Sequence, residues 1–350
     1  MRYVTPEHAL AVCVNAAHRR GVSREQAQWF AQALVNTSLW GIDTHGLRLL
    51  PLYLRELDEG RSNPKPSLAT HIAGPVALVE GDNALGTVAG SYAAICAANL
   101  ARDIGVGVVS VRRSNHFGAA SVYGDIIARQ GMVGLVTTSA ASRMTPFNGT
   151  QPFFGTNPIC FSAPSQDDRP FVLDMATSQI SYSQVKHYRA AGLELGTGWA
   201  LDAAGHPTTK PEQAVTLAPL GGYKGQGLAM MVQILSALLA GMPLDTELEH
   251  LDTGDFTSGR DIGHFLLAID PARLRDAQTF AQSVSSLMKS VREVPSLAGT
   301  EVLCPGDIQA RHEHARRTHG IPLSSVEAAA FEQEEICLAA LNTVTEVKHG

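Results

Sequence analysis

An apolar run, Val106-Gly-Val-Val-Ser-Val111, leads within two residues into Ser114-Asn115-His116-Phe117-Gly118-Ala119, and the architecture of the chain can be inferred from this junction. The apolar run predicts a short buried strand, and residues 120–129 have the pattern of a helix. A histidine, an amide and a glycine therefore lie where a strand ends and a helix begins. Ligands bind at such places in open α/β sheets, because strand ends leave a crevice and helix starts offer free N–H groups. The alternative is an ordinary loop histidine.

Further segments repeat this alternation of strands and helices. Strands are predicted over Val76–Glu80, Val133–Thr137 and Phe171–Thr177, with an Ala-rich helix over Ser91–Asp103. Such alternation is typical of an α/β fold. Near the C-terminal side, Val302–Cys304 predicts one more strand before a turn.

The first sixty residues and the last thirty predict helices instead. Thr5-Pro6 and Ser23 have the pattern of helix starts, and a helix from Ser324 to about Leu341 is expected to return to the N-terminal ones. The apolar block Leu228–Ala240 predicts a buried helix. It is too short to span a bilayer, which needs about 20 residues.

Composition excludes several classes of protein. The chain has 350 residues, a net charge of −6 and no basic cluster, which argues against nucleic acid or an anionic membrane as a partner. Five scattered cysteines fit reduced thiols, and the first residues lack a signal-peptide pattern. We therefore expect a cytoplasmic protein.

Standard cofactor and metal motifs are absent from the sequence. No GxGxxG follows a predicted strand, and His312-Glu-His314 lies on a charged segment that fits a solvated helix better than a metal site. No metal is therefore expected. Lys224, between glycines at a helix start, could bind a phosphate, and Asp174, at a strand end, could bind a ribose or merely cap a turn.

Two histidines lie in loops of small residues, His45 in Thr44-His45-Gly46 and His116 in the junction described above. A histidine with a pKa near 6.5 can exchange a proton near neutral pH. Reduction of a carbonyl by hydride needs such a group beside the oxygen, and a cation for any neighbouring carboxylate. Arg48 and Arg143 are candidates for that cation.

Taken together, these motifs resemble the malate/L-lactate dehydrogenase family of the second, non-Rossmann type, which includes ureidoglycolate, sulfolactate and diketogulonate dehydrogenases. The resemblance covers nearly the whole chain. It is carried by Asp43-Thr44-His45-Gly46, Ser114-Asn115-His116-Phe117-Gly118, Phe154-Gly155-Thr156-Asn157-Pro158, Val172-Leu-Asp174-Met175-Ala176-Thr177, Gly198-Trp199-Ala200, Lys224-Gly225-Gln226-Gly227 and Pro305-Gly306.

The resemblance implies an NAD- or NADP-dependent oxidoreductase, with NAD favoured, that interconverts a small 2-hydroxy acid and a 2-oxo acid or a related imine. It implies a homodimer without metal, built from a helical domain (1–70 with 308–350) and a mixed-sheet α/β domain (71–307) that binds the nucleotide.

The resemblance also assigns residues. His45 would be the acid/base with Thr44 supporting it, although His116 has this role in some members, and both remain candidates. The substrate would contact Arg48, Tyr53, Arg143 and Thr156. The cofactor would contact His116, Phe117, Gly118, Ala119, Ala120, Asp174, Met175, Ala176, Thr177, Lys224, Pro305, Gly306 and Asp307.

The chain departs from the family pattern in its substrate residues. The arginine usually found four residues after the first histidine is Leu49 here, and Arg48 precedes it. A Thr-Asn-Ser sequence is replaced by Thr138-Ser139-Ala140, and a Gly-Lys pair by Ser183-Gln184. We therefore expect a substrate other than plain malate or lactate, with Arg48 or Arg143 binding its carboxylate.

Two other functional interpretations of the sequence stay open. A hydrolase or lyase could use His45 and His116 as an acid/base pair, and it would not bind nicotinamide. A catalytically inactive relative would bind the cofactor without hydride transfer.

Overall fold

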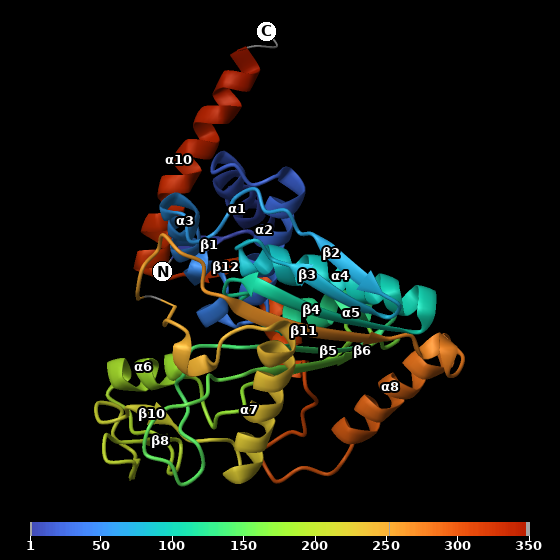
Figure 1. Ribbon diagram of the computed structural model, residues 1–350, viewed down its shortest axis with the longest axis vertical. Helices are drawn as coiled ribbons and strands as arrows, with labels where there is room; N and C mark the ends of the chain where they lie inside the picture. The colour runs from blue at the N-terminus through green and yellow to red at the C-terminus, as the bar shows by residue number, and fades with distance from the viewer. Residues whose placement is uncertain (1, 252, 348–350) are drawn as a thin grey trace.

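The computed structural model describes residues 2–251 and 253–347, with side chains up to residue 339. A central sheet orders its strands as β2-β3-β4-β11-β5-β6-β7 (Figure 1). Strands β3 and β4 run parallel, and the other neighbouring pairs are antiparallel. This mixed order is not the parallel order of a Rossmann sheet, so the expectation of a mixed, non-Rossmann α/β fold is confirmed.

The bounds of the elements are as follows. The helices are α1 (Pro6–Arg19), α2 (Arg24–Leu39), α3 (Leu50–Glu59), α4 (Gly86–Ile104), α5 (Ser121–Arg129), α6 (Tyr182–Ala191), α7 (Tyr223–Ser236), α8 (Ala277–Arg292), α9 (Asp307–His319) and α10 (Ser325–Val347). The strands of the central sheet are β2 (Thr70–Ala73), β3 (Val76–Glu80), β4 (Val106–Ser114), β5 (Val133–Thr138), β6 (Ile159–Ala163), β7 (Phe171–Met175) and β11 (Ile262–Ile269). Two small sheets pair β1 (Arg2–Val4) with β12 (Ile321–Leu323), and β8 (Ala200–Leu201) with β9 (Pro207–Thr208) and β10 (Thr216–Leu217).

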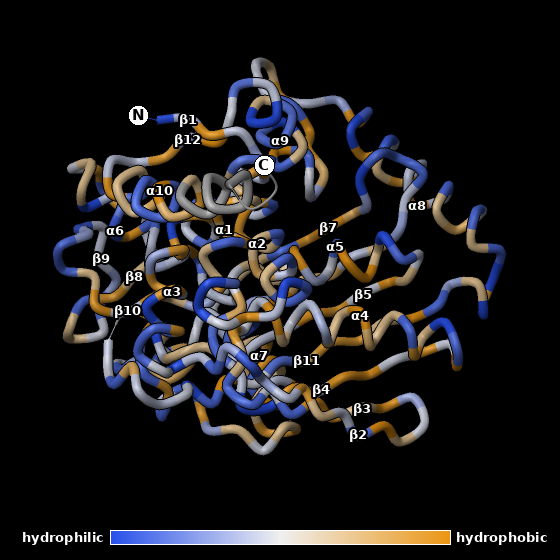
Figure 2. Tube along the Cα trace, turned by 90° about the horizontal axis from the view of Figure 1, so that it is seen from above, coloured by the Kyte–Doolittle hydropathy of each residue, from blue (hydrophilic) through white to orange (hydrophobic). Residues whose placement is uncertain are grey.

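Helices α4 and α5 cover one face of the sheet, and α7 packs on the other (Figure 1). The Ala-rich α4 lies so close to β4 that a Cβ at Gly107 would collide with the carbonyl oxygen of Ala97. The strands β4, β5 and β11 are hydrophobic in Figure 2, whereas α9 at the periphery is largely hydrophilic. The apolar side chains of these three strands join those of the N-terminal helices in one buried cluster.

The two ends of the chain pack together. Helix α10 contacts α1, α9 contacts α2, and β12 pairs with β1. Glu334 of α10 forms ion pairs with Arg19 and Arg20 at the end of α1. The return of the C-terminal helix to the N-terminal ones is confirmed, while the division into two domains at residues 70 and 308 stays a prediction.

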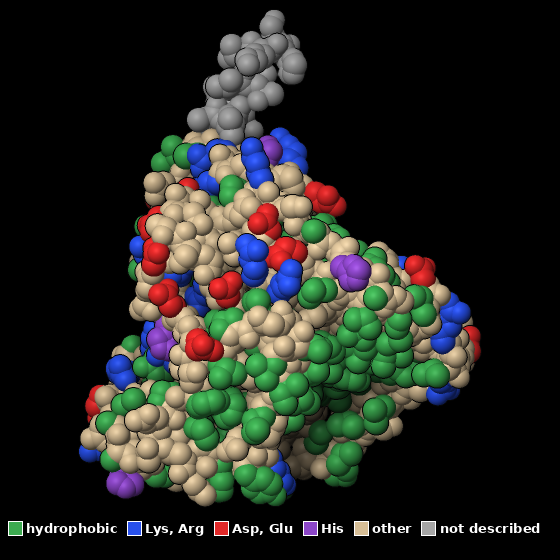
Figure 3. Space-filling model, viewed as in Figure 1, with side chains coloured by type: hydrophobic (Ala, Val, Ile, Leu, Met, Phe, Trp, Pro, Cys, Tyr) green, Lys and Arg blue, Asp and Glu red, His purple; other side chains and the backbone are tan. Residues whose placement is uncertain are grey.

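Two expectations about elements are wrong. Helix α7 is only partly buried: Met230 and Ile234 are 46% and 53% exposed, and Leu238 in the 3₁₀ turn that follows the helix is 52% exposed, because only the opposite side of this apolar segment meets the sheet. Figure 3 shows hydrophobic side chains gathered over this region. The segment 302–304 forms no strand, because the Cys304 amide donates to the Asp307 carboxylate in the turn that begins α9.

Candidate active site

Two short segments bring the histidines together. His45 ends a 3₁₀ turn, Asp43–His45, between α2 and α3, and His116 lies in the turn between β4 and α5. The two imidazole rings stack with centroids 5.7 Å apart and an interplanar angle of 29°. Residues separated by seventy positions in the chain therefore form a single site, which the sequence predicted only through the family resemblance.

Each histidine has one ring nitrogen fixed by a hydroxyl. The Thr44 hydroxyl lies 2.8 Å from Nδ1 of His45, and the Tyr53 hydroxyl lies 2.7 Å from Nδ1 of His116. A hydrogen bond at Nδ1 sets the tautomer and the orientation of an imidazole. Within the described part of the chain, Nε2 of both rings is thus left for a ligand.

Burial keeps this pair neutral. It lowers the pKa of His45 from 6.5 to about 4. The pKa of His116 is held well below its usual value by burial first, and then by the charges of His45, Arg260 and His264. Both imidazoles are therefore neutral near pH 7.

Asn115 holds the turn that carries His116. Its amide nitrogen donates to the backbone oxygens of Asn83 and Ala84, and its oxygen accepts the backbone N–H of Arg260 at 3.1 Å. This side chain is fully buried, so its hydrogen bonds support the loop and leave it unavailable to a substrate.

The sequence analysis missed two buried residues beside the site. His264 of β11 stacks on Phe117 at 4.5 Å and bonds Thr138 and Ser114 through its two ring nitrogens, each at 2.8 Å. Burial lowers its pKa to about 3. Arg260, just before β11, is 7% exposed. A charged residue and a histidine next to an apolar strand were the only signal for them in the sequence.

The four residues predicted to contact the substrate lie in different surroundings. Tyr53 lies in the site through its bond to His116. Arg48 has an exposed side chain, while Leu49 is buried. Arg143 places its guanidinium 4.4 Å from the ring centroid of Tyr182. The Thr156 carbonyl accepts hydrogen bonds from the backbone and hydroxyl of Thr177.

A groove of about 940 Å³ lies between α2, α5 and the start of α9. A smaller hollow continues it, sharing Trp40, Asp125, Arg169, Pro170 and Gly306 with the groove and reaching Ser121 and Asp174. Ser121 directly follows the segment of His116 to Ala120, so the hollow extends toward the histidine pair.

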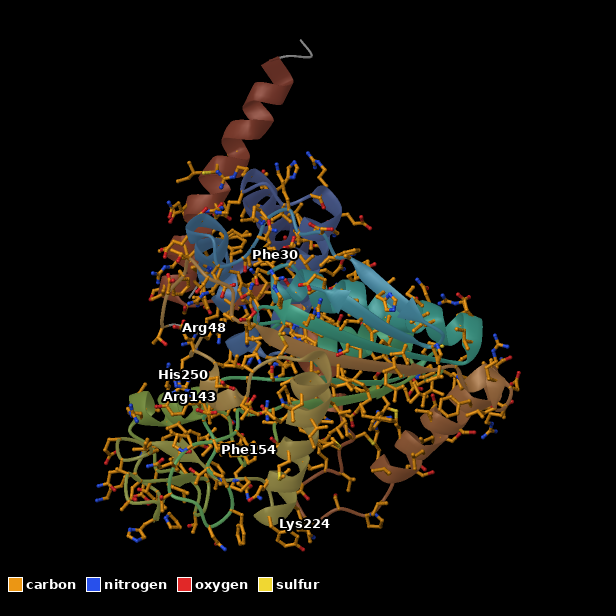
Figure 4. The ribbon with its side chains drawn as sticks, viewed as in Figure 1. Phe30, Arg48, Arg143, Phe154, Lys224 and His250 are labelled. Carbon is orange, nitrogen blue, oxygen red and sulfur yellow. The ribbon has the colours of Figure 1, made fainter. Side chains whose placement is uncertain are left out.

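Four of the predicted cofactor residues line the smaller hollow or this groove. Pro305, Gly306 and Asp307 line it, and the Asp174 carboxylate accepts the Ser121 N–H at 2.8 Å at the start of α5. The other predicted residues next to them are Phe117, Gly118, Ala119 and Ala120 before α5, and Met175, Ala176 and Thr177 after Asp174. Lys224 lies elsewhere: it is exposed in the first turn of α7, far from Phe30 on α2 (Figure 4).

The groove fits a dinucleotide in size and chemistry. Its volume is at the upper end of the usual range for small-molecule and cofactor sites. Helix α9 begins there at Gly306, which has no side chain to cap the first N–H groups, and such groups bind phosphates. Oδ1 of the buried Asp125 has no hydrogen-bond donor among the described residues.

Comparison with known proteins identifies the class. The profile of the malate/L-lactate dehydrogenase family matches residues 4–331, nearly the whole chain. The fold and the histidine site thus define a dehydrogenase, and the chain belongs to the malate/L-lactate dehydrogenase family. The expected resemblance is confirmed, and with it the expectation of an oxidoreductase.

Individual relatives differ in substrate and cofactor. The L-sulfolactate dehydrogenase of Methanocaldococcus jannaschii is 32% identical over 89% of this chain and 90% of that protein. Its solved structure superimposes with a TM-score of 0.90 at 30% identity, covering 97% of this chain and 98% of that one. The (2R)-3-sulfolactate dehydrogenase (NADP(+)) of Chromohalobacter salexigens is 32% identical, covering 95% and 97%. The ureidoglycolate dehydrogenase (NAD(+)) of Escherichia coli K12 is 31% identical, covering 88% and 89%.

Proposed function

We propose that this protein transfers a hydride between a nicotinamide dinucleotide and a small 2-hydroxy acid or its 2-oxo acid. The observation that carries the proposal is the stacked pair of His45 and His116, each with Nδ1 fixed and Nε2 available. A groove of dinucleotide size supports it, because the smaller hollow that continues the groove reaches Ser121, at the end of the segment that begins with His116. The relatives named above act on hydroxy acids, which supports the same class of substrate here.

The cofactor is proposed to occupy the groove, where it would supply the hydride. The free N–H groups at the start of α9 would hold its phosphates. Asp174, Met175, Ala176 and Thr177 at the end of β7, and the segment from His116 to Ala120, would line its nicotinamide half.

The charges of the groove favour NAD over NADP. Four arginines lie along it, and each already has a carboxylate partner: Arg129–Asp125 at 2.7 Å, Arg169–Glu313 at 3.0 Å, Arg317–Glu313 at 2.6 Å and Arg292–Asp307 at 2.7 Å. A 2′-phosphate needs a cation that is free to bind it. Competition from these carboxylates supports NAD.

His45 is proposed to move the proton. During reduction its Nε2 would donate a proton to the oxygen of the substrate carbonyl, and during oxidation it would accept that proton. We favour His45 over His116 because the positive charge of Arg260 acts on His116 and disfavours its protonated form. Thr44 holds His45 in the required tautomer, and Tyr53 orients His116.

We also propose a homodimer, and the surface of α7 supports it. Its exposed apolar ridge of Met230, Ile234 and Leu238 would be covered by a second copy of the chain. Lys224, at the start of the same helix, would then lie at the subunit interface.

The location is proposed to be the cytoplasm. The cysteines are all unpaired as described, which fits a reducing compartment. Within the described residues, no helix combines the length and apolar character needed to cross a membrane.

The test begins with fluorescence titration of the protein with NADH and with NADPH. A panel of 2-oxo acids and cyclic imines, including the oxo forms of malate, sulfolactate and ureidoglycolate, is then added while the absorbance of the reduced nicotinamide is followed. Binding with turnover is expected, with NADH binding more tightly. Binding without turnover on any member would favour an inactive relative, and failure of both cofactors to bind would favour a hydrolase or lyase that uses the two histidines.

A further inference from the structure

Arg260 is a buried cation at the edge of the histidine site. Its backbone N–H is held by Asn115, the residue that precedes His116, and its side chain is 7% exposed. One nitrogen of the guanidinium, Nη2, donates to the backbone oxygen of Glu249 at 2.6 Å. This contact fixes the direction of the side chain without neutralising it.

The rest of this guanidinium lacks partners. Nε and Nη1 of Arg260 are buried and have no hydrogen-bond acceptor among the described residues. Buried N–H donors are nearly always satisfied in folded proteins, so two unsatisfied donors on one cation indicate that a ligand is missing. A buried positive charge is also unfavourable unless an anion accompanies it.

The carboxylate with the largest effect on the pKa of Arg260 is that of Glu56, which forms no hydrogen bond with the guanidinium and whose Oε1 is itself buried without a partner among the described residues. Glu56 is fully buried and accepts a hydrogen bond from Ser62 at 3.0 Å, but no bond joins it to Arg260 in the described structure. Burial raises the pKa of Glu56, which weakens its negative charge. Glu249 has a half-exposed side chain that pairs with Arg61 at 3.3 Å.

Arg61 differs from Arg260 although both are buried. It also has two nitrogens without partners, but its Nη2 donates to the backbone oxygens of Thr253 and Asp255. Its guanidinium lies 3.7 Å from the ring centroid of Phe256. Arg61 thus anchors the loop before β11, whereas Arg260 adjoins the reacting groups.

The backbone of Arg260 is hydrogen-bonded to Asn115, the neighbour of His116, and the charge of its side chain acts on groups of the site. Its charge is among the causes that lower the pKa of His116, and it also acts on the pKa of Tyr53, whose hydroxyl bonds His116. Leu49, Tyr53 and Glu56 follow one another at helical spacing from the preceding turn into α3 and are buried. The charge of Arg260, which lies outside α3, acts to lower the pKa of both Tyr53 and Glu56.

We propose that the guanidinium of Arg260 binds the carboxylate of the substrate and so places its 2-oxo carbon beside His45 and His116. A carboxylate has the planar, two-oxygen geometry that two adjacent guanidinium N–H groups recognise. It would also neutralise the buried charge. This inference rests on the proposed function, because it assumes an acid as the substrate.

The contacts of Arg48 and Arg143 make both residues weaker candidates than Arg260 for binding the substrate carboxylate. Arg48 is exposed to solvent, and Arg143 stacks on Tyr182. An exposed cation binds a carboxylate weakly, because water screens the pair. A buried guanidinium with free donors binds it more strongly, since a bond to a charged group contributes more in a dry site.

The experiment compares the 2-oxo acid that gives the best turnover with its uncharged amide. In Arg260→Lys and Arg260→Gln, kcat/KM for the acid is expected to fall about tenfold to a hundredfold, chiefly through KM, while the amide changes less than about threefold. NADH binding should be unchanged. Arg61→Lys is the matched control. It alters a buried arginine of the same cluster and should not change the ratio of kcat/KM for the acid to kcat/KM for the amide.

Oxamate provides a second measurement. It resembles a 2-oxo acid, because it keeps the carboxylate and has an uncharged amide group attached to it. Calorimetric titration of the folded Arg260→Lys variant with oxamate should show at least tenfold weaker binding than the wild type, with or without NADH. The proposal would be overturned if kcat/KM fell equally for the acid and the amide. It would also be overturned if kcat/KM for the acid fell selectively in Arg48→Ala or Arg143→Ala instead. If neither nicotinamide binds, the proposed function fails separately, and oxamate binding to the free protein still tests Arg260.

Discussion

The hydroxyl of Tyr53 lies 2.7 Å from Nδ1 of His116, and this contact joins α3 to the turn that follows β4. One partner comes from the N-terminal helices and the other from the central sheet. The geometry of the site therefore depends on how these two parts of the chain pack, and a change at Tyr53 should affect chemistry before it affects cofactor binding.

Replacing Tyr53 with Phe removes this hydroxyl with little change in shape. Nδ1 of a buried imidazole would be left without a partner, at a cost of about 1–3 kcal/mol. We expect kcat to fall about tenfold to a hundredfold, with an unchanged fluorescence titration by NADH. Phe30→Leu, which alters a buried ring that packs on Tyr53 from α2 at 6.1 Å, serves as a control for packing alone. An equal fall in kcat for both variants would contradict an orienting role for the hydroxyl.

The pH dependence of hydroxy acid oxidation should report His45. The histidine must be neutral to accept the proton, and burial lowers its pKa to about 4. In the direction of oxidation, kcat/KM should therefore be level above pH 5 and fall as the pH drops through about 4. An inflection near 6.5, the value of an exposed histidine, would contradict the buried, neutral pair. In His45→Gln the residual rate should lose this inflection.

Asp174→Asn tests the assignment of the groove. The substitution keeps the size of the side chain but removes the negative charge at the start of α5, where Asp174 accepts the Ser121 N–H. If this carboxylate also bonds a ribose hydroxyl, NADH should bind about tenfold more weakly, since a hydrogen bond to a charged group contributes about 1.5–3 kcal/mol. Asp276→Asn, at the exposed start of α8, should leave NADH binding unchanged. A normal titration by NADH in Asp174→Asn would exclude that bond.

Ile234→Glu tests the homodimer. A charge in the centre of the apolar ridge of α7 cannot be buried against a second copy without a large loss of free energy. We expect the wild type to sediment as a dimer and the variant as a monomer. Leu274→Glu, at another exposed apolar side chain that is 81% accessible, should remain dimeric. A monomeric wild type would rule the interface out.

The sequence predicted several strands of the sheet because strand and helix patterns are local, but it did not predict β2 or β6. Val76–Glu80 is a strand with those bounds, and β4 extends the predicted Val106–Val111 by only three residues, to Ser114. His45 and His116 were identified because small residues on both sides mark functional loops. Their stacking could not be predicted, since it depends on packing between α3 and β4.

Other features depend on contacts between distant segments. Arg260 lies in an irregular loop, and its position near the turn of His116 follows from the bond between its backbone and Asn115, 145 residues earlier. The exposed side of α7 has the same apolar composition as a buried helix, so composition alone could not distinguish a core from a surface ridge. The groove is likewise lined by elements from both ends of the chain.

The central claim is that a hydride passes from the nicotinamide to the carbon that bears the substrate oxygen. The most direct test uses NADH carrying deuterium at the transferred position, the 2-oxo acid that gives the best turnover, and mass spectrometry of the product. We expect the wild type to form a 2-hydroxy acid with one deuterium on its C2 carbon, and we expect this product to be lost in His45→Gln, which should still bind NADH. A product without deuterium, or equal rates in the two proteins, would contradict the claim.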